Sequence, residues 1–538
     1  MRKKLSLLLC LLALACLLCV SVHAEEPVVV EQTCTGIIQS GGFPEAPQSG
    51  LRLYASAQSA DDTLAGAKAA LKQGLETFQT EIDISEYQIS TDKIESVFEQ
   101  VVNENPELFF VSGTFYYSYT SSQTVTSVRP YYQLDGKEIE PEELKEEQKT
   151  RINEQRGELE AVVNEIKAQV DPGWSPLEKA LFLHDYLATH AQYDTGSDAY
   201  TILTKGTGVC QAYTLAYRLL LNRVGISSGT VSSENLHHIW NLVQIDGNWY
   251  HVDVTWDDPT KDRIGRVRHE NFCTSDEKRE KLVKEAMKNE ENWTFKQDWV
   301  YSPAVSASSS FDSRYWTGVD SAYVPLNGKW YYLSYLSYRR FALMQTEDPI
   351  EAGSRNKVID VGWKVRGGGG YWIGQFSGLS RYQNALIYNT PDTIYRYDPE
   401  KGEPQALHKL TDAEQAVGDI YGSVVYGDEL KYTLLETPNE KWTKLYTLEL
   451  DPYKAVPEGG YAYSIQGGTL SLKRLDTQPS GCVIAAWYGA DSRMLGAARM
   501  ETQERTLSLP KTAVTVKLFA VSQTGSIPLC KAVELSAK

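Results

Sequence analysis

Two neighbouring stretches decide how this chain is interpreted: GVCQAYTLAYRLLLNRVGI at Gly208–Ile226 and HHIWNLVQIDGNWYHVDVTWDDP at His237–Pro259. The first has the apolar spacing of an amphipathic helix that begins at Cys210 and ends before Gly225. A thiol at a helix start faces unpaired N–H groups and the positive end of the helix dipole, which favour the nucleophilic thiolate. We therefore predict that Cys210 is a nucleophile.

The second stretch predicts a β-hairpin. Asp246-Gly247 is typical of a two-residue turn, and it joins expected strands at His238–Ile245 and Trp249–Trp256. In that register His238 and Asp253 share one face and lie diagonally, roughly 7–8 Å apart along the backbone. An imidazole and a carboxylate can meet across this gap, so Asp253 is expected to orient a protonated His238.

The hairpin leaves two other histidines open as alternatives. His251 shares the face of Asp253, so spacing alone does not exclude it. His237 is expected on the opposite face, which has the pattern of a core. A turn longer by one residue would exchange His237 and His238.

A family resemblance rests on these motifs. Gly208-Val-Cys-Gln, His238-Ile-Trp-Asn and the run Asp253–Pro259 resemble the transglutaminase-like superfamily of bacterial secreted proteins, as does EKALFLHDYLATHAQYD upstream. The resemblance implies a catalytic triad of Cys210, His238 and Asp253, which selects His238 among the histidines. It spans about residues 176–276. Ala212 departs from the glycine frequent in relatives, without touching the triad.

The resemblance also implies a fold and a reaction. The fold class is α+β: a papain-like core with the Cys-bearing helix on an antiparallel sheet, an N-terminal α/β extension and C-terminal all-β domains. The reaction is acyl transfer, in which the Cys210 thiolate attacks an amide and the Cys210 N–H is one oxyanion donor. Water as acceptor gives hydrolysis and a lysine amine gives cross-linking, and the motif is shared by both.

Composition shifts and patterns predict the remaining organisation. Residues 327–349, 383–402 and 427–452 resemble one another, which favours a β-repeat region, either part of a propeller or an irregular set of hairpins. The predicted parts are a signal peptide (1–24), a leader (25–60), an N-terminal α+β extension (61–170), the transglutaminase-like core (171–280), a linker (281–310), the β-repeat region (311–458) and a small β-sandwich (459–538).

The net charge and the export signal restrict the possible functions and partners. The 538-residue chain has a net charge of −17, and loss of the three basic residues in the signal peptide takes it to −20. Such acidity argues against nucleic acid and anionic membrane surfaces as partners. The basic start, the apolar run and the small-residue cleavage site predict secretion, with no stable membrane insertion after cleavage. The tail resembles a small β-domain of Gram-positive secreted proteins.

Five cysteines remain after signal cleavage, so at least one thiol is expected to be unpaired. These are Cys34, Cys210, Cys273, Cys482 and Cys530, of which Cys482 and Cys530 form a possible pair.

A few further side chains have weaker signals. Tyr193 and Trp240 are candidate substrate-binding residues, because they lie near the triad in sequence or on its expected face. Asp257-Asp258 is expected to form a turn or cap, and His184 is expected to be structural, since no second histidine follows one helical turn later. We predict neither a metal site nor a cofactor.

The sequence as a whole predicts an exported cysteine-dependent enzyme that acts on protein or peptide amides, as a peptidase, an amidase or a transglutaminase. Its expected partner is a protein or peptide substrate, at a cell wall or a host surface. The alternative is a non-catalytic secreted binding or adhesion protein that uses the β-rich C-terminal half.

Overall fold

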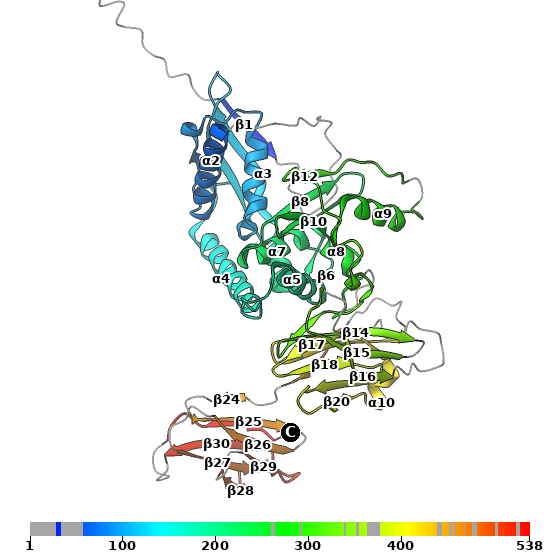
Figure 1. Cartoon of the computed structure of the whole chain (residues 1–538). Helices are drawn as coiled ribbons and strands as arrows, with labels where there is room; N and C mark the ends of the chain where they lie inside the picture. The colour runs from blue at the N-terminus through cyan, green and yellow to red at the C-terminus, as the bar shows by residue number, and fades with distance from the viewer. Residues whose placement is uncertain are drawn as a thin grey trace, which may run out of the picture. The chain divides into compact units, whose positions relative to one another are not determined.

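A computed structural model shows two compact units, residues 1–379 with 438–441 and residues 380–437 with 442–538. The labelled elements are drawn in Figure 1. The structure describes residues 28–33, 58–259, 264–290, 293–337, 340–350, 355–362, 377–437, 444–450, 454–456, 459–466, 468–475, 481–500, 504–522 and 528–537. The predicted signal peptide lies outside the described residues.

An antiparallel sheet with three helices forms the N-terminal extension. The sheet order is β1-β3-β4-β2, with β5 on β4. Its core includes Phe98 stacked on Phe115 at 4.3 Å between ring centroids. The bounds are β1 (Val28–Thr33), β2 (Ile82–Asp83), β3 (Val111–Tyr119), β4 (Val125–Leu134), β5 (Lys137–Ile139), α2 (Gln58–Glu76), α3 (Ile94–Glu104) and α4 (Glu146–Ala168). The predicted leader is therefore partly structured, because β1 pairs with β3 and α2 begins at Gln58.

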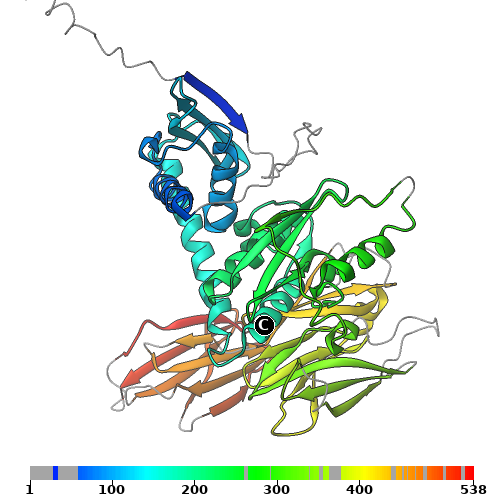
Figure 2. The ribbon, with the colours of Figure 1, turned by 45° about the horizontal axis from the view of Figure 1, so that its top comes forward.

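Helices on an antiparallel sheet form the transglutaminase-like core, as predicted. Helix α7 (Cys210–Arg223) packs on β9 (His238–Ile245) and against α5 (Pro176–His190). Figure 1 labels α7 beside α5, and Figure 2 shows the same part of the chain from a second side. The Thr214 hydroxyl donates to the Ile239 carbonyl at 3.1 Å, which fixes the helix on the strand. The sheet order is β11-β10-β9-β8-β12, with β8 (Ser228–Ser233), β10 (Asn248–Val252), β11 (Phe272–Thr274) and β12 (Val300–Ser302).

Local signals set the ends of these helices. Ser175 and Glu178 form the expected capping box at the start of α5, where the Ser175 hydroxyl accepts from the Glu178 N–H at 3.2 Å. Gly225 follows α7 with a φ of 78°, the left-handed conformation that glycine adopts without strain. Residues 281–310, predicted as a linker, contribute β12, which pairs with β8 in the core sheet.

The hairpin has the predicted turn but a shorter second strand. Asn248 pairs with Ile245, as a two-residue turn requires. The strand stops at Val252, because the Asp253 side chain accepts from the Trp256 N–H and caps a short helix, α8 (Val254–Asp257). The expectation of a strand through Trp256 is therefore wrong. The pattern also predicted His237 on the core face of the first strand. In the structure His237 is exposed and lies before that strand.

The β-repeat region consists of antiparallel sheets of consecutive strands. The three similar stretches supply β14 and β15, β18 and β19, and β22 and β23, each pair within a separate sheet. The first sheet belongs to the first unit. The bounds are β13 (Val324–Leu326), β14 (Lys329–Ser337), β15 (Arg340–Thr346), β16 (Asn356–Gly362), β17 (Leu379–Tyr382), β18 (Ala385–Asn389), β19 (Thr393–Tyr397), β20 (Pro404–Lys409), α10 (Asp412–Val417), β21 (Asp419–Tyr426), β22 (Glu429–Leu435) and β23 (Tyr446–Glu449).

Two four-stranded sheets form the C-terminal sandwich and share one apolar core. Their strands are β24 (Lys454–Val456), β25 (Tyr461–Gln466), β26 (Thr469–Arg474), β27 (Gly481–Tyr488), β28 (Met494–Arg499), β29 (Glu504–Ser508), β30 (Thr515–Ser522) and β31 (Val533–Ser536). Cys482, buried in β27, is unbridged, so the possible pairing with Cys530 is not formed. Within the described residues, no helix has the length and apolarity needed to cross a bilayer.

Candidate active site

Cys210 is the first residue of α7 and is 5% exposed. Burial alone would raise the pKa of its thiol. The hydrogen bond and the charge of His238, together with the Ile239 N–H, outweigh burial and lower this pKa below its usual range. The thiol therefore has the environment of an activated nucleophile.

His238 connects the thiol to a carboxylate. Its Nε2 lies 2.7 Å from Asp253 Oδ2, and its side chain also hydrogen-bonds Cys210. The imidazole stacks on the rings of Trp240 and Trp256, with centroid distances of 5.6 and 5.5 Å. Burial lowers the pKa of His238, but the charge and hydrogen bond of Asp253 and the contact with Cys210 raise it to about 9. The predicted meeting of His238 and Asp253 is confirmed.

Asp253 is held on both carboxylate oxygens. Oδ1 accepts from the Trp256 N–H at 3.1 Å, while Oδ2 accepts from His238 and from the Arg279 guanidinium. Burial raises the pKa of Asp253, and the charges of His238 and Arg279 more than offset this and lower it. The carboxylate therefore stays ionised and can stabilise an imidazolium at His238.

Arg279 is the functional neighbour that sequence reasoning missed. It lies in α9 (Asp276–Ala286) and is fully buried. Its guanidinium lies over the rings of Trp240 and Trp256, 4.7 and 4.3 Å from their centroids, and donates to Asn271 Oδ1 at 2.5 Å. Within α9 the buried residues are Arg279 and Val283, four residues apart, and this spacing was the available signal.

The rival histidines have other partners. His251 is buried, its Nδ1 accepts from Trp240 Nε1 at 2.9 Å, and its Nε2 lies 2.9 Å from Asp276 Oδ1. Burial lowers the pKa of His251 despite Asp276. His237 is exposed. His238 is therefore the histidine that the fold brings to Cys210.

Comparison with known proteins identifies the family of the region that contains these residues. The sequence profile of the transglutaminase-like superfamily matches residues 161–254, which contain Cys210, His238 and Asp253. This region belongs to the transglutaminase-like superfamily. A solved structure described as "Crystal structure of a TGase" is 14% identical and has a TM-score of 0.18. That match covers 31% of this chain and 48% of the other, so this chain spans about half of its length. No curated protein matches the chain.

The two candidate substrate-binding aromatics of the transglutaminase-like region differ in exposure. Tyr193 in β6 (Gln192–Tyr193) is 56% exposed and lies beside Cys210. Burial, followed by the charge of Cys210, raises its pKa. Trp240 is 1% exposed and packs on His238, so it presents no surface to a substrate. Its substrate-binding role, inferred from an expected strand face, does not fit this burial.

A second polar cluster lies in the same region. His184 Nδ1 and His269 Nε2 lie 2.9 and 2.8 Å from Asp185 Oδ1, and these ligand-type atoms lie within 4.8 Å of one another. The other ring nitrogens face Asp257 Oδ2 at 3.2 Å and the Val319 carbonyl at 2.7 Å. Such donors suit a metal ion such as Zn²⁺, and the second histidine comes from a distant loop. As the cluster stands, every ring nitrogen has a hydrogen-bond acceptor.

The Asp257-Asp258 pair ends the short helix α8, with Asp258 as its C-cap, in agreement with the turn or cap expected from the sequence. Both residues are buried. Asp257 Oδ1 accepts from the backbone and side-chain N–H groups of Asn271, each at 3.0 Å, while Asp258 accepts from the Tyr213 hydroxyl at 2.5 Å. The short helix α8 turns these acids inward, where they fix the segment that carries Asp253.

Proposed function

We propose that the protein is an exported cysteine-dependent acyl-transfer enzyme that acts on protein or peptide amides. The observation that carries this proposal is the continuous chain from Cys210 through His238 to Asp253, in which the pKa of the thiol is lowered and that of the imidazole is raised to about 9. These shifts favour a thiolate–imidazolium pair near neutral pH, which is the state needed for nucleophilic attack.

The reaction follows from this pair. The Cys210 thiolate attacks the amide carbonyl carbon, and the negative charge moves to the carbonyl oxygen. His238 gives its proton to the leaving amine as the C–N bond breaks, which leaves a thioester on Cys210. His238 then takes a proton from the acceptor, water or a primary amine, and the acyl group leaves the sulfur.

The backbone N–H of Cys210 is the proposed donor to the oxyanion. Tyr193 lies beside Cys210, so the substrate oxygen is expected to reach this N–H next to the Tyr193 side chain. Because Tyr193 is exposed beside the nucleophile, we also propose that it borders the bound substrate.

Export and partners are part of the proposal. The N-terminal signal sequence supports secretion, and the acidic charge of the chain supports protein or peptide rather than nucleic acid as the substrate. The β-rich C-terminal half is proposed to present the enzyme at a cell wall or a host surface.

The test uses the full chain without its signal sequence. Release of peptides from casein measures hydrolysis, and incorporation of a fluorescent alkylamine into casein measures transfer to an amine. We expect turnover in at least one assay, and we expect Cys210→Ala to abolish it with an unchanged circular dichroism spectrum. Cys482→Ala, which removes another buried thiol, is the matched control and should keep its activity. Turnover that survives in Cys210→Ala would overturn the mechanism.

A further inference from the structure

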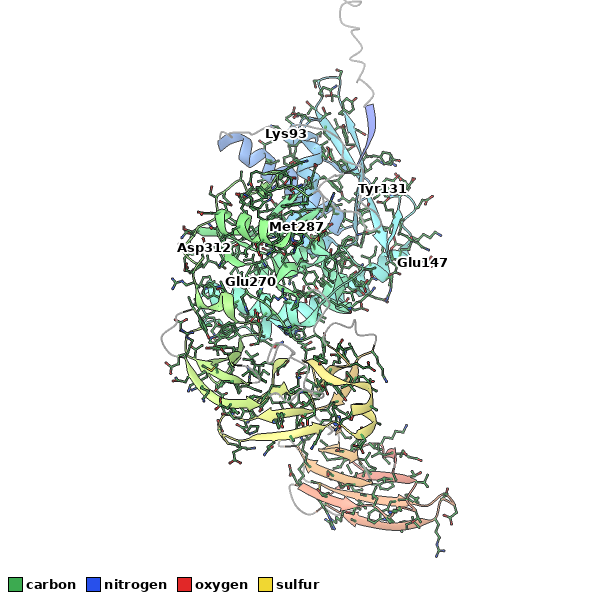
Figure 3. All side chains as sticks on the ribbon, turned by 90° about the vertical axis from the view of Figure 1, so that its right-hand side faces the viewer. Lys93, Tyr131, Glu147, Glu270, Met287 and Asp312 are labelled. Carbon is green, nitrogen blue, oxygen red and sulfur yellow. The ribbon has the colours of Figure 1, made fainter. Side chains whose placement is uncertain are left out.

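A cavity of about 120 Å³ lies between the N-terminal extension and the transglutaminase-like region. Its apolar wall includes Leu108, Val111 and Leu215, and its polar groups include Glu138, Asp198 and Gln211. Figure 3 shows the two parts of the first unit, with Tyr131 in the extension and Glu270 in the core. The cavity exceeds the roughly 10–15 Å³ that one water molecule needs.

Gln211 is the residue after the nucleophile, and its side chain lines this cavity. It is 4% exposed, and its Oε1 has no hydrogen-bond partner. No protein group donates to this oxygen, so in a cavity of this size it can accept from water or from a ligand. The cavity therefore contains an acceptor that lacks a donor.

Two carboxylates make the cavity acidic. Glu138 accepts from the hydroxyls of Ser112 and Thr114, while Asp198 accepts from the Thr201 N–H at 2.8 Å. The residues that line the cavity include no lysine, arginine or histidine. Burial raises the pKa of Asp198 by more than the hydrogen bonds of Thr201 and the charge of Lys205 lower it.

These groups fit a primary ammonium on an apolar stem. An ammonium has three donors and no acceptor, and here the Gln211 amide oxygen and the Glu138 carboxylate can accept from it. The Asp198 carboxylate accepts from the Thr201 N–H and hydroxyl, and it adds negative charge to the cavity. The apolar wall suits a methylene chain that leads into the cavity from its exposed mouth, where Glu138 lies. A lysine side chain has both parts, whereas an anion would meet two like charges.

The backbone connects the cavity to the nucleophile. The Val209 N–H donates to the Gly196 carbonyl at 2.7 Å, so the segment 193–198 lies beside the residue that precedes Cys210. Tyr193 at one end of the segment contacts Cys210, and Asp198 at the other end lines the cavity. Cys210 itself does not line the cavity, so an ammonium held there is not placed to attack a thioester.

We propose that this cavity is a specificity subsite for a lysine side chain of the peptide or protein substrate, near the amide that reacts at Cys210. The proposal rests on the proposed function for its role in catalysis. Lysine binding itself does not require turnover, so the two can fail separately.

The test measures binding to the full chain with Cys210→Ala, which removes the nucleophile. The probes are Nα-acetyl-lysine N-methylamide and Nα-acetyl-norleucine N-methylamide, whose stems match except for the ammonium. Their dissociation constants come from titrations followed by NMR or calorimetry. Because hydrogen bonds to charged groups are the stronger ones, we expect the lysine probe to bind roughly tenfold tighter or more.

Two further variants assign the preference to the cavity. Gln211→Met removes the unpartnered oxygen at nearly constant volume, and Glu138→Gln removes the carboxylate at the exposed mouth. Each should weaken the lysine probe about tenfold and leave the norleucine probe unchanged. Glu143→Gln makes the same charge change at an exposed position outside the cavity and should have no effect.

Equal binding of the two probes would overturn the proposed subsite. A lysine preference that survives in Glu138→Gln would also overturn it, because this substitution lies at the surface and does not threaten folding. A lysine preference that both variants remove would support it. Turnover of the wild-type protein on casein is measured separately. Its absence would overturn the proposed function without touching the binding result.

Discussion

Asp253 supports His238 only because Arg279 and the Trp256 N–H hold the carboxylate in place. We regard Arg279 as a positioning residue that acts through Asp253 rather than on the substrate. A buried guanidinium opposite a buried carboxylate leaves a strong imbalance when either one is removed. The indole rings of Trp240 and Trp256 contact both the Arg279 guanidinium and the His238 imidazole.

Replacement of Arg279 should therefore disturb both stability and the pH profile. We expect Arg279→Leu to lower the free energy of unfolding by about 3–5 kcal/mol, because it leaves Asp253 buried without its cation. Loss of that cation also raises the pKa of Asp253, so the acid limb of the pH–activity profile moves to higher pH. Denaturant unfolding and pH-dependent turnover measure the two effects.

Two control variants separate positioning from packing. Arg279→Lys keeps the charge and should restore the acid limb in part. Lys284→Leu changes an exposed cation on the same helix and should leave the profile as it is. An Arg279→Leu protein with an unmoved acid limb would contradict the positioning role.

At the residue scale, the helix start made Cys210 a candidate nucleophile, and the hairpin turn put His238 on the expected face of Asp253. Spacing alone left His237 and His251 open, and the choice of His238 rested on the family resemblance. The sequence did not predict Arg279, because an arginine in a strongly charged helix resembles a solvent-exposed one. It also did not predict that His184 and His269 both contact Asp185, because His269 lies 84 positions after Asp185 in the sequence. Such pairings depend on the packing of several elements.

At the element scale, local chemistry predicted the helices better than the strand ends. The capping box at Ser175 placed the start of α5 correctly, because all its hydrogen bonds are local. The second hairpin strand was predicted too long, because Asp253 competes as a cap for α8 and ends the ladder at Val252. The same change of direction brings Asp253 to His238.

Capping boxes with a hydroxyl at the N-cap begin α5 in the first unit and α10 in the second, which allows a matched test. Ser175→Ala should lower the free energy of unfolding of the first unit by about 1 kcal/mol, because the Glu178 N–H loses its acceptor. Thr411→Ala should do the same to the second unit through Glu414. Chemical denaturation followed by hydrogen exchange of peptides from each unit measures the effects. A loss that appears equally in both units for either variant would show that they unfold together.

At the scale of the whole molecule, a buried polar network ties parts of the first unit together. His184 and Asp185 come from α5 and Asp257 from α8, while Tyr323 donates its N–H to Asp185 Oδ2 at 2.7 Å. Burial lowers the pKa of His184, but the hydrogen bonds of Asp185 and Asp257 raise it to about 9. The network therefore carries a buried proton at neutral pH.

This proton makes the stability of the first unit depend on pH. Because the pKa of His184 rises from 6.5 to about 9 on folding, its contribution is fully present below about pH 6.5 and is lost as the pH rises through about 9. At about 1.4 kcal/mol per pKa unit, the loss is about 3 kcal/mol. His184→Gln should flatten that part of the curve, measured by denaturant unfolding from pH 6 to 10. His408→Gln in the second unit is the control, and a His184→Gln protein with the wild-type slope would contradict the assignment.

We propose above all that Cys210 is a thiolate activated by His238. The most direct test is the rate at which iodoacetamide alkylates Cys210. Peptide mass mapping measures this rate from pH 5 to 10. We predict rapid labelling at about pH 6, below the usual thiol range near 8.5, and much slower labelling in His238→Gln. His237→Gln, which changes the adjacent exposed histidine, should label like the wild type. Labelling that rises only near about pH 8.5 in the wild type, or that slows equally in both variants, would contradict the account.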